Sequence, residues 1–287
     1  MILVTGATGH LGNAVVQHLL KTIPASQIAI LARQKEKAIA FETLGVTVKL
    51  GDFDDTNALQ AALSGIEQVV LISGTDPVHR LQQHKNVVDA AVAASVKRII
   101  YTSIAMESLA TSHNQFLMES HFKTEAYIEQ SGLTYSFFKN NLYTDTIPLF
   151  AGDNPFAHGI TLPTGSGKVA FAWRNDIAEA IAHHLLQPIN SNQVFQITGN
   201  VAYNFEEIAT MLSTLSGKQV TFTHVDATTY ENMLQQVGVP TPLIPVLLGF
   251  TADISNHQHQ AVATDLEKLL GRKPTEMAAA LKTMYHL

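Results

Sequence analysis

The spacing of three glycines near the N-terminus constrains the fold of this chain more than any other feature. Residues 2–5 (ILVT) form an apolar run, and Gly6, Gly9 and Gly12 follow it with the spacing G-x-x-G-x-x-G. In a strand–turn–helix unit, the first glycine permits a sharp exit from the strand, and the second lets backbone N–H groups approach a pyrophosphate. The third lets the helix pack close to the strand. A tight turn without a ligand would show the same glycines. The elements that follow in the sequence must therefore distinguish a dinucleotide site from a plain turn.

Short apolar runs alternate with helical patterns through the first half of the chain. The runs expected to form buried parallel strands are 2–5, 28–32, 46–50, 69–73, 98–103 and 134–139. Apolar residues recur at helical spacing between them, as at Leu11, Val15 and Leu19. Strands that alternate with helices imply right-handed crossovers. The sequence therefore predicts the α/β class, with a Rossmann-type, doubly wound parallel sheet.

The pattern changes after about residue 142, where turn-rich segments such as 163–168 appear. The elements expected there are a helix at 176–186, a strand at 194–198 and a helix at 205–215. The apolar, proline-containing segment 241–250 is expected to form a lid or a cleft wall. We therefore predict a dinucleotide-binding domain at 1–142 and a smaller α/β substrate-side region at 143–287, interleaved with the sheet and approximate in its boundary.

Composition excludes several classes of protein. The 287 residues carry a net charge of −6, with no run of Lys or Arg and no Cys. A nucleic-acid partner has little electrostatic support, and disulfides, thiolate metal sites and cysteine nucleophiles are excluded. No segment approaches the roughly 18 apolar residues of a membrane span, and the N-terminus shows no basic leader region. The histidines show no metal-ligand spacing. We expect a soluble, cytoplasmic protein without a metal site.

The ends of the next strands predict the coenzyme. The second strand ends at Arg33, without the carboxylate that NAD-preferring enzymes carry about 20 residues past the glycine turn. Arg33, supported by Lys35 or Lys37, would instead pair with a 2′-phosphate, which predicts a preference for NADPH. A solvated surface arginine is the alternative.

Two further strand ends are expected to contact the coenzyme. Asp52 would accept a hydrogen bond from the adenine amino group, and Phe53 would cover the base, although Asp52 would serve equally well as a helix cap or turn residue. Ser73 and Gly74 are small enough for the backbone to pass beside the nicotinamide ribose.

Several segments together carry a resemblance to a known family. GATGHLG, the strand-end arginine, GDF, HKNVVDAA, KRIIYTS, HFKTE and KNNLYTD resemble the NmrA-like branch of atypical short-chain dehydrogenases. Within that branch the match is closest to bacterial NADPH:quinone oxidoreductases and triphenylmethane reductases. The resemblance implies a Rossmann domain, bound NADP(H) and a smaller C-terminal domain that closes over the substrate.

The resemblance also assigns individual positions. It implies a pyrophosphate loop of Gly6, Ala7, Thr8, Gly9, His10 and Leu11, a 2′-phosphate contact at Arg33, and a nicotinamide end lined by Asn140, Leu142 and Tyr143. The chain departs from the family at Lys139, where arginine is usual, and at Asn141, where a small residue is common.

The tyrosine and lysine of the wider superfamily's Y-x-x-x-K pair are absent. Aligning on Glu125 places Leu117 at the tyrosine position and His121 at the lysine position. Ketone reduction needs a positioned acid, which contributes roughly 10²–10⁴-fold. A quinone instead yields a phenolate-like anion, and a phenol has a pKa of about 10, so water or a weak donor suffices. A cationic triarylmethane dye needs no proton at all.

The sequence therefore predicts an NADPH-dependent, flavin-independent reductase of quinones or similar electron-poor aromatic compounds. The candidate catalytic residues are Tyr143, as stacking partner or proton donor, His121, as orienter of the nicotinamide ribose, and Ser103. Each of the three would fit a purely structural role as well. The alternative function is a non-catalytic NADP-binding redox sensor, and a homodimer is a further possibility.

Overall fold

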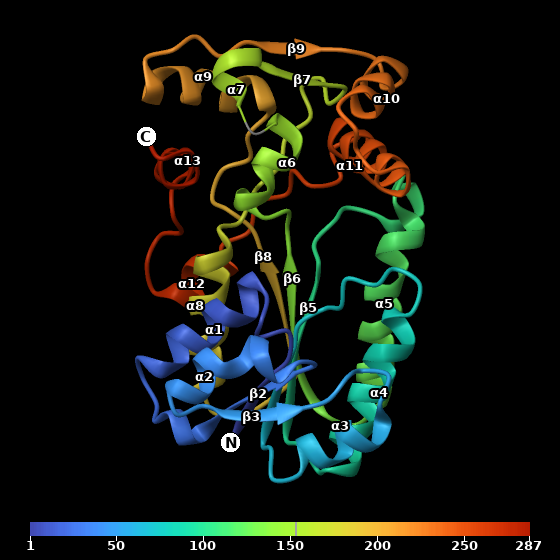
Figure 1. Ribbon diagram of the computed structural model, residues 1–287, viewed down its shortest axis with the longest axis vertical. Coiled ribbons are helices and arrows are strands. Elements are labelled where there is room, and N and C mark those ends of the chain that lie inside the picture. Colours follow the sequence, from blue (N-terminus) through green and yellow to red (C-terminus); the bar gives the residue numbers. More distant parts are fainter. Residues whose placement is uncertain (153) are drawn as a thin grey trace.

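A parallel sheet with helices on both faces forms the lower part of the molecule in Figure 1, a computed structural model that describes residues 1–152 and 154–287. The sheet has seven strands in the order β3-β2-β1-β4-β5-β6-β8. Their bounds are β1 (Ile2–Val4), β2 (Ile28–Ala32), β3 (Thr47–Leu50), β4 (Gln68–Leu71), β5 (Arg98–Ile104), β6 (Thr134–Asn140) and β8 (Gln193–Ile197). The order reverses between β1 and β4, which opens a crevice at the carboxyl ends of these strands. The predicted doubly wound sheet is confirmed.

Two layers of helices cover the sheet (Figure 1). One layer consists of α1 (His10–Leu20), α8 (Arg174–Leu185) and α12 (Asp265–Leu270), with α2 (Ile39–Thr43) beside it. The other consists of α3 (Thr56–Leu63), α4 (Arg80–Ala93) and α5 (Gln115–Gln130). Short 3₁₀ turns lie at Ala25–Gln27, Lys35–Ala38, Leu109–Thr111, Thr144–Thr146 and Thr241–Leu243.

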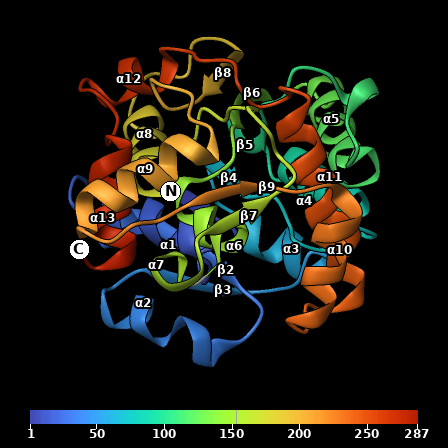
Figure 2. The same ribbon diagram turned by 90° about the horizontal axis from the view of Figure 1, so that it is seen from above.

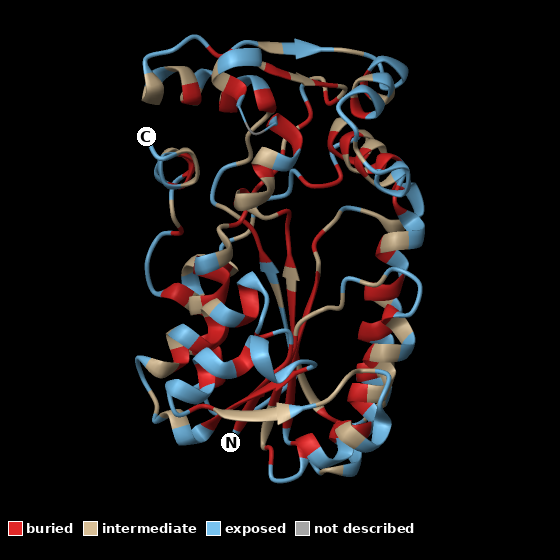
Figure 3. Cartoon of the chain, viewed as in Figure 1, coloured by how far each residue is buried: buried red, intermediate tan, exposed pale blue. Residues whose placement is uncertain are grey.

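Alternation along the strands explains why they are apolar almost throughout. Val4 and Ile100 face the layer of α1, where Val15 packs, and the neighbouring Leu3 and Ile99 face the opposite layer. Successive side chains point to opposite faces, so a strand buried on both sides needs apolar residues at every position. Figure 3 shows the inner strands of the sheet buried along most of their length, whereas the edge strands β3 and β8 are mainly intermediate or exposed, so the run at 46–50 is not the buried strand that the sequence predicts.

A smaller region lies above the carboxyl edge of the sheet and has its own apolar core. It contains β7 (Ile160–Leu162) paired with β9 (Phe222–His224), and Figure 2 shows the surrounding helices from above. These helices are α6 (Ile147–Ala151), α7 (Pro155–His158), α9 (Phe205–Ser216), α10 (Ala227–Gln236), α11 (Ile244–Ser255) and α13 (Met277–Tyr285). Within the described residues, no helix combines the length and the apolar character needed to cross a bilayer.

Residues beyond 142 contribute to both parts of the molecule. Helices α8 and α12 pack on the sheet, and β8 pairs with β6, which leaves the rest of this half to form the upper region. Arg272, just after α12, pairs with buried Asp176 of α8 at 2.8 Å and so fastens the returning chain. The boundary at residue 142 stays a prediction.

A buried carboxylate holds the upper region over the sheet edge. Asp253 of α11 is fully buried, accepts a hydrogen bond from Ser112 Oγ at 2.7 Å, and accepts another from the His113 N–H at 2.6 Å. Both donors lie in the connection between β5 and α5. Helix α11, which contains most of the segment predicted as a lid or cleft wall, is therefore fixed beside the crevice.

Candidate functional site

A cavity of about 870 Å³ lies at the carboxyl edge of the sheet, between the sheet and the upper region. It brings together most of the residues that the sequence singled out: Gly6, Thr8, Gly9, His10, Leu11, Arg33, Asp52, Phe53, Ser73, Gly74, Ser103, His121, Asn140, Leu142 and Tyr143. Ala7, Lys35 and Lys37 do not line it. Ala7 is buried in the core beneath the turn, and the two lysines are exposed outside the cavity.

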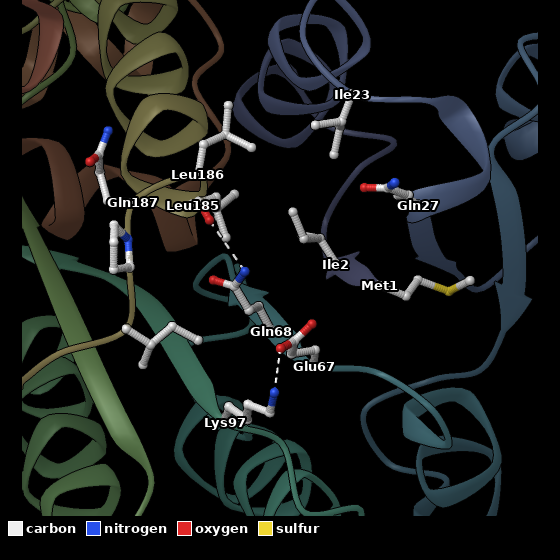
Figure 4. A pocket seen from close by; sticks show the side chains of 12 residues that line it. Met1, Ile2, Ile23, Gln27, Glu67, Gln68, Lys97, Leu185, Leu186 and Gln187 are labelled. Carbon is white, nitrogen blue, oxygen red and sulfur yellow. Dashed lines mark hydrogen bonds and ion pairs between the residues drawn. The ribbon is translucent and has the colours of Figure 1, made fainter.

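A second cavity, of about 600 Å³, lies at the opposite, amino edge of the sheet (Figure 4). Three of its polar side chains already have partners: Lys97 pairs with Glu67 at 2.6 Å, and Gln68 donates to the Leu185 carbonyl at 3.2 Å. None of the predicted site residues lines it. The crevice at the carboxyl edge is therefore the candidate site.

The glycine turn leaves room for an anion against the start of α1. Gly6 has a φ of +61°, a left-handed conformation that disfavours side chains, and a Cβ on Gly12 would lie 2.4 Å from the Gly6 carbonyl oxygen. Gly9, the residue before α1, makes no side-chain cap. The first N–H groups of the helix thus remain available to a ligand, and the helix dipole favours negative charge there.

Arg33 and Asp52 lie together on one side of this turn. The Arg33 side chain is 79% exposed, and its Nε is 3.9 Å from Asp52 Oδ2. The other oxygen of Asp52 accepts the Asp54 N–H at 3.0 Å, as in a turn. Phe53 is held through its carbonyl, which accepts Asn86 Nδ2 at 2.9 Å. The exposed Arg33 side chain can rotate toward a phosphate. Asp52 stabilises a turn, which is the alternative role that the sequence left open for it.

Side chains behind the end of β4 hold both polar groups of the Gly74 peptide. The Gly74 N–H donates to His84 Nε2 at 3.0 Å, and the Gly74 carbonyl accepts Arg80 Nε at 2.7 Å. The preceding Ser73 N–H donates to Thr102 Oγ1 at 2.9 Å. The backbone that passes along the cavity here is therefore held in place by side-chain hydrogen bonds.

Two buried polar atoms lack partners where β5 and β6 end. Ser103 Oγ and Asn140 Oδ1 are without hydrogen bonds among the described residues, although Ser103 is only 4% and Asn140 only 2% exposed. Buried polar atoms are normally satisfied. Both residues line the cavity, although the two oxygen atoms are themselves buried.

Tyr143 is arranged as a hydrogen-bond donor. Asn140 Nδ2 donates to the Tyr143 hydroxyl at 3.2 Å, so the phenolic proton stays available. Burial raises the pKa of Tyr143, opposed by the Asn140 hydrogen bond and by Arg174, so the phenol is protonated at neutral pH. The Arg174 guanidinium lies 4.6 Å above the ring centre and pairs with Asp145 at 2.6 Å. One face of the ring is thereby covered, which leaves at most the other for stacking.

His121 is locked in one tautomer. Arg80 Nη1 donates to His121 Nε2 at 3.1 Å, and because an arginine is always a donor, Nδ1 must carry the ring proton. Nδ1 lies 2.9 Å from the Tyr101 hydroxyl. Burial, together with the charge of Arg80, lowers the pKa of His121 to about 3. His121 reaches the cavity as a neutral residue with both ring nitrogens engaged.

The departure from the family at Lys139 does not face the cavity. Lys139 Nζ pairs with Glu125 of α5 at 2.9 Å, and the alternation along β6 turns the neighbouring Asn140 toward the site. Asn141 does line the cavity, but its Nδ2 donates to the His259 carbonyl at 2.9 Å.

The structure adds cavity residues that sequence reasoning missed. They are chiefly Arg80 and Arg174, both from helices, and Leu149 and Phe150 of the upper region, which line the cavity together with Phe250 of the segment expected to form a lid or cleft wall. No motif marks them. From the sequence alone, an arginine in a helix is interpreted as a solvated surface residue, and apolar residues in helices are interpreted as core residues.

Comparison with known proteins shows which family the chain resembles. A model of the NmrA-like family matches residues 1–284. Quinone oxidoreductase 2 of Escherichia coli (strain K12) is 34% identical over 288 residues, covering 100% of this chain and 99% of that protein.

Solved structures show the same similarity. Citrobacter sp. triphenylmethane reductase complexed with NADP(H) superposes with a TM-score of 0.92 at 35% identity, covering 99% of this chain and 100% of that one. The NADPH-dependent quinone oxidoreductase from Escherichia coli complexed with NADPH gives 0.92 at 34% identity, covering 100% and 99%. The similarity thus includes both the sheet and the upper region.

The tautomer of His121 generates a prediction. NMR of the nitrogen-labelled protein is expected to show a proton on Nδ1, none on Nε2, and no titration between about pH 5 and pH 8. On acidification, the His121 ring binds a second proton near pH 6.5 in the unfolded chain but only near pH 3 in the folded chain. Folding stability is therefore lost as the pH falls below 6.5. The loss is about 1.4 kcal/mol per pH unit for this residue. Exposed His79, whose pKa Asp76 raises, is the internal control. A His121 resonance that titrates near pH 6.5 would contradict the assignment.

Proposed function

Because the chain belongs to the NmrA-like family, we propose that it is an NADPH-dependent reductase that passes hydride directly, without flavin, to quinones or similar electron-poor aromatic acceptors. One observation carries the proposal. A single cavity runs from an uncapped helix N-terminus, framed by glycines, to an apolar wall, and Leu117 stands beside it where the superfamily's acid would be.

The coenzyme end of the cavity fits NADP(H). The N–H groups at the start of α1 would hold the pyrophosphate, in space that a side chain on Gly12 would fill. Arg33 would pair with the 2′-phosphate, and Phe53 would cover the adenine. Ser73 and Gly74 would lie beside the nicotinamide ribose. When bound there, the reduced coenzyme supplies the hydride.

The acceptor end fits a flat, apolar molecule with a polar edge. Leu149, Phe150 and Phe250 provide an apolar wall from two helices of the upper region. Ser103 and Asn140, whose Oγ and Oδ1 have no hydrogen-bond partner, line the same cavity. Such a mixture of apolar surface and a few placed polar atoms is typical of small-molecule sites. The wall would exclude water and hold the acceptor within reach of the hydride donor.

The residues near the acceptor suit a reaction whose product can be protonated without a strong general acid. Leu117 has no acidic group, and His121 is neutral with both ring nitrogens occupied. Tyr143 has a phenolic proton free to donate, because its oxygen accepts from Asn140. It would protonate a hydroquinone anion, whose pKa is close to that of a phenol, about 10.

The sensor alternative is the less favoured. A sensor needs the coenzyme end of the cavity but has no use for an apolar wall beside unpartnered polar atoms. The relatives named above are reductases over the whole length of the chain. A cytoplasmic location and a homodimer stay predictions.

The function is tested by mixing the protein with NADPH and a panel of quinones and following the nicotinamide absorbance. Oxidation of NADPH that requires both the protein and the quinone, with no flavin added, is expected. NADP(H) binding by calorimetry without any acceptor-dependent oxidation would instead support the sensor. Absence of binding to either coenzyme would remove both functions.

Removing the Arg33 charge is expected to change coenzyme preference. The Arg33→Ala variant loses a charge-assisted hydrogen bond worth about 1.5–3 kcal/mol, so its affinity for NADPH should fall by about ten- to a hundredfold. NADH lacks the 2′-phosphate and serves as the internal control, with an unchanged dissociation constant. Equal losses for both coenzymes would remove Arg33 from this role.

Removing the Tyr143 hydroxyl is expected to separate acceptors by their need for a proton. In the Tyr143→Phe variant, kcat with a quinone should fall by about tenfold, less than the 10²–10⁴-fold of an essential acid, because water can also protonate a phenolate. A cationic triarylmethane dye, which becomes neutral on accepting hydride, is the matched control. A comparable loss with the dye would indicate that the hydroxyl only supports packing.

A further inference from the structure

Arg80 lies outside every motif of the sequence, yet it occupies a central place in the candidate site. Resting on the proposed function, we propose that Arg80 stabilises the oxyanion that forms when a neutral acceptor takes up hydride. The same charge makes the site selective for uncharged, carbonyl-bearing acceptors over cationic ones.

The first support is a buried cation without an anion. Arg80 is only 5% exposed, and its Nη1 donates to the Leu117 carbonyl at 3.0 Å, to Ser120 Oγ at 3.2 Å and to His121. Its Nε is taken by the Gly74 carbonyl. In the part of the chain that the structure describes, no carboxylate lies within 4.0 Å of the guanidinium, and Nη2 has no hydrogen-bond partner. Buried charges are normally paired, so an anionic partner from outside is expected.

The nearby carboxylate of Asp76 does not neutralise this charge. Asp76 acts on Arg80 only at a distance, and its own oxygens are engaged by His79, through Nδ1 at 2.8 Å and the backbone N–H at 3.1 Å. Of the other two arginines that line the cavity, Arg174 is already paired with Asp145, and Arg33 lies beside Asp52 at the coenzyme end. Arg80 is therefore the arginine whose charge is left to act on a ligand at the acceptor end.

The second support is its place in the cavity. Arg80 contacts the Gly74 carbonyl at the end of β4 and the backbone of Leu117, the position where the superfamily carries its tyrosine. This end lies across β1 from Arg33, because Arg33 follows β2 and the sheet order is β2-β1-β4. The charge thus sits at the nicotinamide and acceptor end, away from the expected 2′-phosphate.

The third support is the hydrogen-bond network that fixes the guanidinium. His121 accepts from Arg80 through Nε2 and donates its Nδ1–H to the Tyr101 hydroxyl oxygen. A protonated histidine would offer no lone pair and would repel the guanidinium, and burial keeps the pKa of His121 far below its usual value. His121 acts here as a positioning residue, and the cation that a lysine would provide on α5 comes instead from Arg80 on α4.

The chemistry of the acceptors explains the selectivity. A quinone receives the hydride with its two electrons from the reduced coenzyme, which becomes oxidised. The electrons of the carbonyl system move onto oxygen, and this oxyanion later takes a proton from Tyr143 or water. The negative charge arises only during the reaction, so a fixed cation assists the transition state more than the ground state. A cationic dye gains hydride at carbon and becomes neutral, so the same cation offers no help and repels it.

The test compares acceptors in an Arg80→Met variant. With NADPH and an uncharged naphthoquinone, kcat/KM should fall by about ten- to a hundredfold, the range of a lost charge-assisted hydrogen bond. With a cationic triarylmethane dye it should stay level or rise. Lys85→Gln is the matched control, because it removes a positive charge from the same helix outside the cavity, where Lys85 lies over the Tyr127 ring. Equal losses with both acceptors would overturn the proposal.

A second measurement needs no turnover. Para-nitrophenol absorbs differently as phenol and phenolate, so its ionisation can be followed when it binds with oxidised coenzyme. The wild-type protein should favour the bound phenolate and lower the apparent pKa of the probe. Arg80→Met should abolish that shift, and Arg80→Lys should keep part of it. A probe pKa unaffected by Arg80→Met in a variant that still binds NADP would also overturn the proposal.

The wild-type protein alone keeps the inference testable if Arg80→Met does not fold. Among acceptors of matched reduction potential, uncharged quinones should be reduced faster than cationic dyes, and the probe should bind as phenolate. The opposite order of rates, or binding of the neutral phenol, would contradict the role of Arg80. Failure of the wild type to reduce any acceptor would refute the proposed function instead, and the phenolate measurement would still report on the charge.

Discussion

The close approach of α1 to the turn after β1 is the constraint on which the rest of the site depends. Gly12 lies so near the Gly6 carbonyl that a Cβ there would be 2.4 Å from its oxygen. The helix therefore begins directly at the crevice, with its first N–H groups uncapped. Every other group of the site is placed relative to this point by the strand order. Arg33 and Asp52 come from β2 and β3 on one side, and Gly74, Ser103 and Asn140 come from β4, β5 and β6 on the other.

The acceptor end combines two features that are costly in a protein interior, an unpaired cation and unpartnered polar oxygens. The sheet needs neither feature for its stability, because the cores on both of its faces are apolar. Their coexistence in one cavity indicates that stability has been given up there for the sake of a ligand. In the proposed reaction this end needs no strong acid, since the acceptor itself is avid for hydride. What it supplies is shape, a fixed charge and one weak proton donor.

The fold was readable from the sequence wherever local pattern and tertiary packing agree. Parallel strands buried on both faces must be almost wholly apolar, and glycines at a close backbone approach cannot be replaced, so both left a strong signal. Arg80 left none, because an arginine buried against carbonyl oxygens has the same helical context as one in water. Phe250 lies in a segment correctly suspected to form a wall, but its direction depends on the buried Asp253, which ties α11 to a loop far away in sequence. Strand β8 was expected, whereas its place beside β6 follows from a long connection that no local pattern encodes.

The upper region has an apolar core separate from those that flank the sheet. The wall that would meet the acceptor is built on that core, through Leu149, Phe150 and Phe250, whereas the coenzyme groups are built on strand ends. Substitutions in the core of the upper region can consequently change which acceptors fit the cavity without weakening the binding of the coenzyme. One scaffold with this division can therefore suit different acceptors, and the solved structures that share it are a triphenylmethane reductase and a quinone oxidoreductase.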